Sequence, residues 1–189
     1  SVLTVYYDNY RTTESMYIAS TEPLGQITKD QKIVQVIHCD EDGLYSIHLY
    51  LATYGRTNHC NLHVKLLLEN QVIQTWEIEA EKLRDNSYYT LPLDKTIANS
   101  SDLTFTLEIT SNGTDENAVT IYKNSSGDYS GLYINNEHLE GQSLCYQLEY
   151  KTFLGNKESA HIQIFIALCA FLLLFWLVIQ FFSISIVKV

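Results

Sequence analysis

A run of 26 uncharged residues, 162–187, is the feature that most constrains how this chain can fold. As an α-helix that rises about 1.5 Å per residue, it reaches roughly 39 Å, enough to cross a hydrocarbon core of about 30 Å. Its polar side chains are Gln163, Gln180, Ser183 and Ser185, which leave no polar face for water. The run therefore predicts a transmembrane helix, and its position late in the chain is not that of a signal peptide.

The residues before this run have mixed polarity and divide into three parts. We interpret 1–24 as a lead-in segment or an edge strand, 25–152 as a folded domain, and 153–161 as a juxtamembrane linker. The chain begins at Ser1 without Met, as a fragment or a processed product would, which leaves room for a preceding membrane segment.

Alternating apolar and polar side chains predict that the folded domain consists of β-strands. In the stretch LTFTLEI, 103–109, the residues Leu103, Phe105 and Leu107 share one face. Nine strands are expected, at 31–38, 45–53, 61–68, 72–79, 87–93, 103–109, 118–123, 130–134 and 143–150, with one or two helical turns at 79–85. Turns every eight to twelve residues or so predict an all-β fold, an antiparallel sandwich or barrel.

The charge of the chain restricts its partners. The formal net charge is −10 and no cluster of Lys or Arg occurs, so we expect no nucleic acid to bind. An acidic domain is repelled by the anionic lipid surface of the cytoplasmic leaflet. We therefore expect the β-domain on the extracytoplasmic side of a cell membrane.

The cysteines and histidines form no recognisable metal or redox motif. Three cysteines precede the apolar run and Cys169 lies within it, so an odd number remains outside the membrane and no disulfide framework is predicted. No Cys-x-x-Cys pair occurs. His59 and His63 would lie about 13 Å apart along a strand, too far to share an ion. We expect neither a metal nor a cofactor.

Residues 44–73, LYSIHLYLATYGRTNHCNLHVKLLLENQVI, contain the surface that we expect to bind a ligand. If its two strands form an antiparallel hairpin, both apolar rows must share one face, because a slip of one residue would expose a whole row. The register that achieves this pairs Leu51 with Leu62 and Leu49 with Val64.

The outward row of that hairpin carries aromatic and imidazole side chains. It sets Tyr54 opposite His59, Tyr50 opposite His63, and His48 opposite Lys65. Aromatic faces stack on the C–H surfaces of sugars, and phenol and imidazole groups exchange hydrogen bonds with hydroxyls, so this patch, with Arg56 in its turn, predicts glycan binding. The alternative is that aromatic residues simply favour strands and that another strand or domain covers this face.

Two charged residues at turns are expected to have a structural role. A hydrogen-bonded fork from Arg56 to the carboxylate of Asp85 would tie two loops together, and we favour this tie over a ligand clamp. No G-x-S-x-G motif occurs, and no other set of residues suggests catalysis, so we predict that the chain is not an enzyme.

Three short motifs carry a resemblance to a known family. They are AT-x-GR-x-N at 52–58, L-x-DN at 83–86 and L-x-I-x-S at 107–111. Over about residues 25–150 the chain resembles an extracytoplasmic jelly-roll domain of bacterial polytopic membrane proteins linked to surface-polysaccharide and glycosyltransferase machinery. The resemblance implies a jelly-roll β-sandwich that is similar to carbohydrate-binding modules. The chain departs from the family in its cysteines, since Cys39, Cys60 and Cys145 are unusual in an exported bacterial domain.

Together these observations predict an antiparallel jelly-roll β-sandwich followed by one transmembrane helix. We expect a non-catalytic domain that binds or positions polysaccharide or glycolipid during assembly of the cell envelope. Its other expected partners are the lipid bilayer and either a membrane protein or the remainder of the same polypeptide. The alternative is a structural domain for protein–protein interaction that binds no sugar.

Overall fold

The computed structural model describes residues 8–14, 21–125, 131–153, 165–173 and 175–176. The chain divides into two compact units, one of residues 10–152 and one of residues 1–9 with 153–189. The first unit contains nearly all of the described strands, and the helical residues belong to the second.

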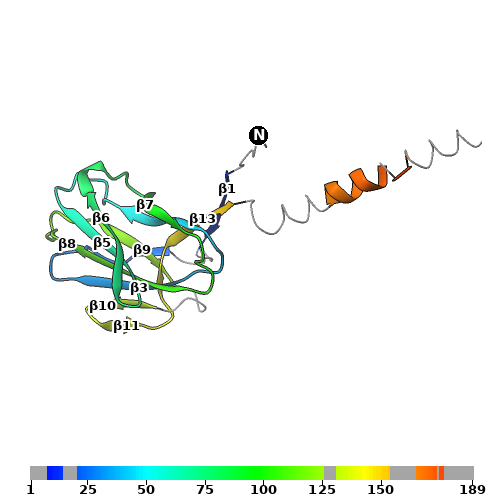
Figure 1. Ribbon diagram of the computed structural model, residues 1–189. Helices are drawn as coiled ribbons and strands as arrows, with labels where there is room; N and C mark the ends of the chain where they lie inside the picture. Colours follow the sequence, from blue (N-terminus) through cyan, green and yellow to red (C-terminus); the bar gives the residue numbers. More distant parts are fainter. Residues whose placement is uncertain (1–7, 15–20, 126–130, 154–164, 174, 177–189) are drawn as a thin grey trace, which may run out of the picture. The chain divides into compact units, whose positions relative to one another are not determined.

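Residues 10–152 form an all-β sandwich of two antiparallel sheets, whose strands can be followed in Figure 1. The first sheet contains β1 (Asp8–Glu14), β13 (Tyr146–Phe153), β4 (Leu44–Ala52), β9 (Thr120–Asn124) and β12 (Ser143–Leu144), with β2 (Thr21–Pro23) paired to β9 and β7 (Ser87–Ile97) paired to β4. The second sheet has the order β11 (Glu137–Leu139), β10 (Leu132–Ile134), β3 (Lys32–His38), β8 (Thr104–Ser111), β5 (Asn61–Leu68) and β6 (Gln71–Glu79).

One hydrophobic core lies between the two sheets, and the predicted alternation along the strands accounts for it. On β8, Phe105, Leu107 and Ile109 are buried while the residues between them are partly exposed. On β5, Leu62 and Val64 are buried in the same cluster. Period-two alternation therefore identified the inward face of these strands correctly, because successive side chains of a strand point to opposite faces.

The predicted hairpin between residues 45–53 and 61–68 is wrong. Strand β4 pairs with β13, β7 and β9, whereas β5 pairs with β6 and β8 in the other sheet. Their apolar rows therefore belong to opposite walls of the core, and Leu49 lies opposite Tyr146 and Tyr89 instead of Val64. The outward rows of β4 and β5 consequently point away from each other.

Several element boundaries differ from those expected. The expected helix at 79–85 is reduced to one 3-10 turn, η1 (Ala80–Lys82), between β6 and β7. The expected strand 143–150 is divided into β12 and β13, because Cys145 donates its N–H to Tyr122 while its C=O accepts from Tyr50. Strand β11 was not expected, since three residues are too few to show alternation.

The apolar run predicted to cross a membrane is described only in part. Residues 165–173 and 175–176 are helical, and the rest of 162–187 lies outside the described residues, as do residues 154–161 of the expected linker. Within the described part of the chain, no helix is both long enough and apolar enough to span a membrane.

A buried amide ties the two sheets together. Gln35 points from β3 into the core and is fully buried. Its Oε1 accepts a hydrogen bond of 2.8 Å from the N–H of Leu144 on β12, and its Nε2 donates to the C=O of Val36 at 2.7 Å. Because buried polar groups need partners, this side chain fixes the position of β12 relative to β3.

We expect Gln35→Ala to lower the free energy of unfolding by about 2 kcal/mol, because it leaves the buried N–H of Leu144 without its acceptor. Urea unfolding followed by circular dichroism measures the change. Gln71→Ala is the control, since Gln71 is exposed at the start of β6 and should have little effect. Equal stability of the Gln35 variant and the parent chain would contradict a structural role for this amide.

Candidate functional site

Three tyrosines gather on the outer face of the first sheet. Tyr50 of β4 lies opposite Tyr88 of β7 in the strand register, and their ring centroids are 4.9 Å apart at an interplanar angle of 42°. The ring of Tyr122, from β9, lies 4.8 Å from Tyr50 at an angle of 36°. Tilted rings at these separations attract one another, so the outward side chains of three adjacent strands form one aromatic surface.

A tight turn after β4 adds a fourth tyrosine, and Tyr50, Tyr54, Tyr88 and Tyr122 are called the tyrosine cluster below. Tyr54 and Gly55 have positive φ angles of 61° and 66°, which reverse the chain directly after the strand. The guanidinium carbon of Arg56 lies 5.3 Å from the centre of the Tyr54 ring, within range of a cation–π interaction. The turn thus places an aromatic ring and a cation beside the three strand tyrosines.

The carboxylate of Asp85 holds this turn in place. It accepts a hydrogen bond from the backbone N–H of Thr53, at the start of the turn. This bond is the main reason that the pKa of Asp85 lies below its ordinary value, and further bonds from the Thr53 side chain and the N–H groups of Gly55 and Asn86 act in the same direction. The carboxylate therefore remains ionised and preorganises the loop that carries Tyr54.

Tyr122 is fixed by a hydrogen bond at the edge of the cluster. Its hydroxyl donates to Oδ1 of Asn86 over 2.7 Å. Burial is the main reason that the pKa of Tyr122 is raised, and electrostatic interactions with Tyr50, Asp85 and Tyr54 raise it further. The phenol thus stays protonated at neutral pH and keeps its role as a donor.

The cluster combines exposed aromatic faces with hydrogen-bonding groups. Tyr54 and Tyr88 are 45% and 42% exposed, whereas Tyr50 and Tyr122 are less exposed and support them. The phenol groups, the Asn86 amide and the Asp85 carboxylate supply donors and acceptors around the rings. This arrangement suits a ligand with both apolar C–H faces and hydroxyl groups.

The structure brings together only part of the predicted ligand patch. Tyr50, Tyr54 and Arg56 lie in or beside the tyrosine cluster. His63 does not, because it projects from β5 in the other sheet, opposite Glu77 and Thr110. His59 lies in the loop that follows Arg56, where its Nδ1 is 3.0 Å from Glu81.

Arg56 and Asp85 each stabilise the turn, but they do so through separate partners. Arg56 donates from Nε to Asn58, and from Nη2 to Gln26 and to the C=O of Ala118. Asp85 binds the backbone of the turn instead. Among the residues that the structure describes, the two side chains form no ion pair with each other.

The residues that sequence reasoning missed are Tyr88, Tyr122 and Asn86. Tyr88 and Tyr89 are adjacent in the sequence, and only alternation with the buried Leu91 shows that Tyr88 points outward. Tyr122 joins the cluster because β9 continues beside the end of β4, a pairing that no local pattern reveals. Asn86 has a φ of 51°, in the left-handed region that Asn adopts more readily than most residues.

A polar network lies next to the tyrosine cluster on the same face. Ser46 donates its hydroxyl to Glu149, and Nε2 of His48 is 3.2 Å from that hydroxyl and 3.3 Å from the carboxylate. Nδ1 of His48 is 2.9 Å from the hydroxyl of Thr90. Ser46 and Glu149 thus contact the same nitrogen of His48, whereas in a nucleophilic triad the serine and the carboxylate contact different nitrogens. Ser46 is also fully buried. The network therefore fixes β4 to its neighbours β13 and β7.

The cysteines of the sandwich are buried and free. Burial raises the pKa of Cys39 and of Cys145 to about 11, and it raises the pKa of Cys60 as well. Thiols with raised pKa values stay protonated and react slowly. These side chains therefore act as small apolar residues of the core.

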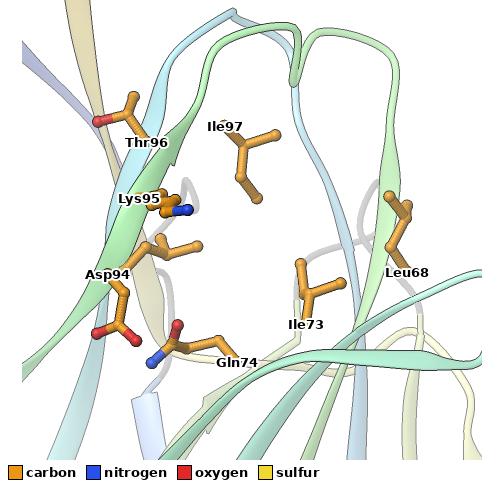
Figure 2. Close-up of a pocket in the computed structure, with 8 residues that line it drawn as sticks. Leu68, Ile73, Gln74, Asp94, Lys95, Thr96 and Ile97 are labelled. Carbon is orange, nitrogen blue, oxygen red and sulfur yellow. The ribbon is translucent and has the colours of Figure 1, made fainter.

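A separate cleft of about 460 Å³ opens between β6 and β7. Figure 2 shows Leu68, Ile73 and Ile97 around this space, with Gln74, Asp94, Lys95 and Thr96 along its side. Leu93 completes the lining. The cleft lies at the side of the sandwich, between β6 at the edge of the second sheet and β7, which pairs with β4 of the first sheet.

Comparison with known proteins assigns this chain to no family. No protein-family model and no curated protein matches it. Among solved structures, a crystal structure of the infectious bursal disease virus VP2 subviral particle is similar over 82% of this chain and 34% of that chain, with 13% sequence identity and a TM-score of 0.22. The chain spans about a third of the length of that viral chain, and likeness at this level carries no argument about function.

The contribution of Asp85 to stability should depend on pH. Its pKa is lower in the folded chain than the unfolded value of about 3.9, so its stabilising effect is present above pH 4 or so and is lost as the pH falls towards the folded pKa. Asp85→Ala should therefore destabilise the domain by no more than about 1 kcal/mol at pH 7, and by less at pH 3.

Urea unfolding at both pH values tests this expectation. Asp115→Ala serves as the control, since the Asp115 carboxyl makes no hydrogen bond to other residues in the described ranges and should show little effect at either pH. A difference between the parent and Asp85→Ala that is as large at pH 3 as at pH 7 would contradict the assignment.

Proposed function

We propose that this chain is a membrane-anchored β-sandwich that binds glycan through the tyrosine cluster and supports assembly of cell-envelope polysaccharide. The observation that carries the proposal is the convergence of four tyrosines from β4, β7, β9 and the turn at Tyr54 on one face of the first sheet. In this proposal the domain holds or senses polymer and catalyses no reaction.

The chemistry of the cluster matches that of sugars. A pyranose ring has C–H faces that pack on aromatic rings, and its hydroxyl groups both donate and accept hydrogen bonds. Tyr54 and Tyr88 supply the exposed rings, and Asn86 lies beside them through its bond to Tyr122. The bonds from Asp85 to the turn hold Tyr54 in position before ligand arrives, which reduces the entropy lost on binding.

Two further parts of the proposal are supported by sequence. The uncharged run 162–187 supports a transmembrane helix that anchors the domain outside the cytoplasmic membrane. The net charge of −10 agrees with a position away from anionic cytoplasmic lipid. The two antiparallel sheets are compatible with jelly-roll topology, which we propose as the finer description of the sandwich.

Removing an exposed ring should weaken glycan binding. Tyr54→Ala and Tyr88→Ala are each expected to lower affinity about tenfold, because each removes one stacking face. Binding of the full chain is measured first on an array of hexose, N-acetylhexosamine and uronic-acid oligosaccharides, and then by calorimetry with the best of them.

Tyr133→Ala is the matched control, because Tyr133 lies on β10 in the other sheet. Its affinity should equal that of the parent chain. The proposal is overturned if no glycan on the array binds, or if the Tyr133 variant loses as much affinity as the two cluster variants.

The proposed anchor can be tested by adding charge to the apolar run. In the double variant Phe171→Asp with Leu172→Asp, each carboxylate should cost about 2.5–3.5 kcal/mol at the centre of a membrane helix, enough to release the chain. Alkaline carbonate extraction of membranes measures the released fraction. The exchanged pair Phe171→Leu with Leu172→Phe should stay in the membrane, and release of the parent chain would contradict the anchor.

A further inference from the structure

The cleft between β6 and β7 is bordered on one side by an irregularity in β6. Leu66 pairs with Gln74 and Leu67 pairs with Val72, so Ile73 is an extra residue with no partner on β5. Such a β-bulge redirects a side chain, and bulges are over-represented beside functional sites. Here the redirected side chain lines the cleft, as Figure 2 shows for Ile73.

A larger irregularity in β7 borders the other side. On β4, Tyr45 alone separates Leu44 from Ser46, whereas four residues, 93–96, separate their partners Ile97 and Pro92 on β7. Residues 93–96 therefore leave the β4 ladder, and all four line the cleft. The backbone N–H and C=O groups of residues 93–96 therefore lie outside the register of β7 with β4.

The lining of the cleft defines the chemistry of its ligand. Leu68, Ile73 and Ile97 supply an apolar surface, and residues 93–96, which have no register partner on β4, bring their backbone N–H and C=O groups to one wall. Asp94 and Lys95 are adjacent and opposite in sign, so this wall carries no net charge. The site thus favours an uncharged ligand with an apolar side group and a regular series of hydrogen-bonding groups.

We propose that this cleft binds an extended, uncharged peptide segment of a partner protein. The segment pairs its backbone with residues 93–96 of β7 and places an apolar side chain against Ile73 and Ile97. An acyl chain would fill the apolar surface but would form no hydrogen bonds with the backbone of residues 93–96. A second copy of this chain is a poorer occupant, because each copy has a net charge of −10.

This inference does not depend on glycan binding. The tyrosine cluster uses Tyr88 near the start of β7 and the outer face of the first sheet, whereas the cleft uses residues 93–97 near the end of β7 and faces the side of the sandwich. Substitutions in one site leave the residues of the other unchanged, so the two proposals can fail separately.

The test uses the purified full chain and a fluorescent peptide in which Thr and Val alternate over six residues, with both ends blocked. Fluorescence anisotropy should show saturable binding. Ile73→Ser should weaken binding about tenfold, because it removes the apolar contact within the cleft. Val72→Ser is the matched control: Val72 is 51% exposed and Ile73 is 41% exposed, but Val72 does not line the cleft, so its affinity should match the parent chain.

Two competitors separate strand pairing from general apolar binding. The same peptide with methylated backbone nitrogens should bind at least about tenfold more weakly, because it cannot donate to β7. Decanoate should not displace the labelled peptide. The proposal is overturned if the peptide fails to bind, if Val72→Ser and Ile73→Ser have equal effects, if methylation leaves affinity unchanged, or if decanoate competes.

Discussion

The polar contacts of the loop 53–60 hold the crossing between the two sheets, on which the arrangement of the candidate site depends. Asn58 is fully buried, where its amide donates to the C=O of Thr53 and accepts from Nε of Arg56. Arg56 extends this network to Gln26 and to the C=O of Ala118. These bonds hold the loop through which the chain leaves the first sheet after β4 and enters the second at β5. The division of strands between sheets, and the outer face that carries the tyrosine cluster, follow from this crossing.

The sequence was sufficient to predict the strands but not their pairing. Alternation identified the inward residues of β4 and β5, since a half-buried strand must separate its apolar and polar side chains. The apolar rows of β4 and β5 can be buried as neighbours in one sheet. They can equally be buried when the two strands belong to two sheets that face each other across a core. Both arrangements bury the same apolar rows, so no local pattern argued against the predicted pairing of Leu49 with Val64. In the observed arrangement the loop makes long-range polar contacts, from Arg56 to Gln26 and to Ala118.

The candidate site was predictable to a similar extent. Tyr50 and Tyr54 are close in the sequence, and the strand period alone places Tyr50 on the outer face. Tyr88 and Tyr122 reach the same surface only through the pairing of β4 with β7 and β9, which the hydrophobic pattern does not encode. The cleft was missed for a related reason: its walls are made by departures from regular pairing, and an irregular register has no periodic signal.

The indole of Trp76 connects the two edges beside the cleft. Its Nε1 donates a hydrogen bond of 2.7 Å to the C=O of Pro92, so a side chain of β6 is joined to the backbone of β7 just before residues 93–96. Any motion that parts these strands breaks that bond and changes the solvation of the ring. Trp76 is one of two tryptophans in the chain, and Trp176 belongs to the other compact unit. Trp76 is therefore an intrinsic fluorescent probe within the sandwich, and its emission wavelength reports whether β6 and β7 are in contact or apart.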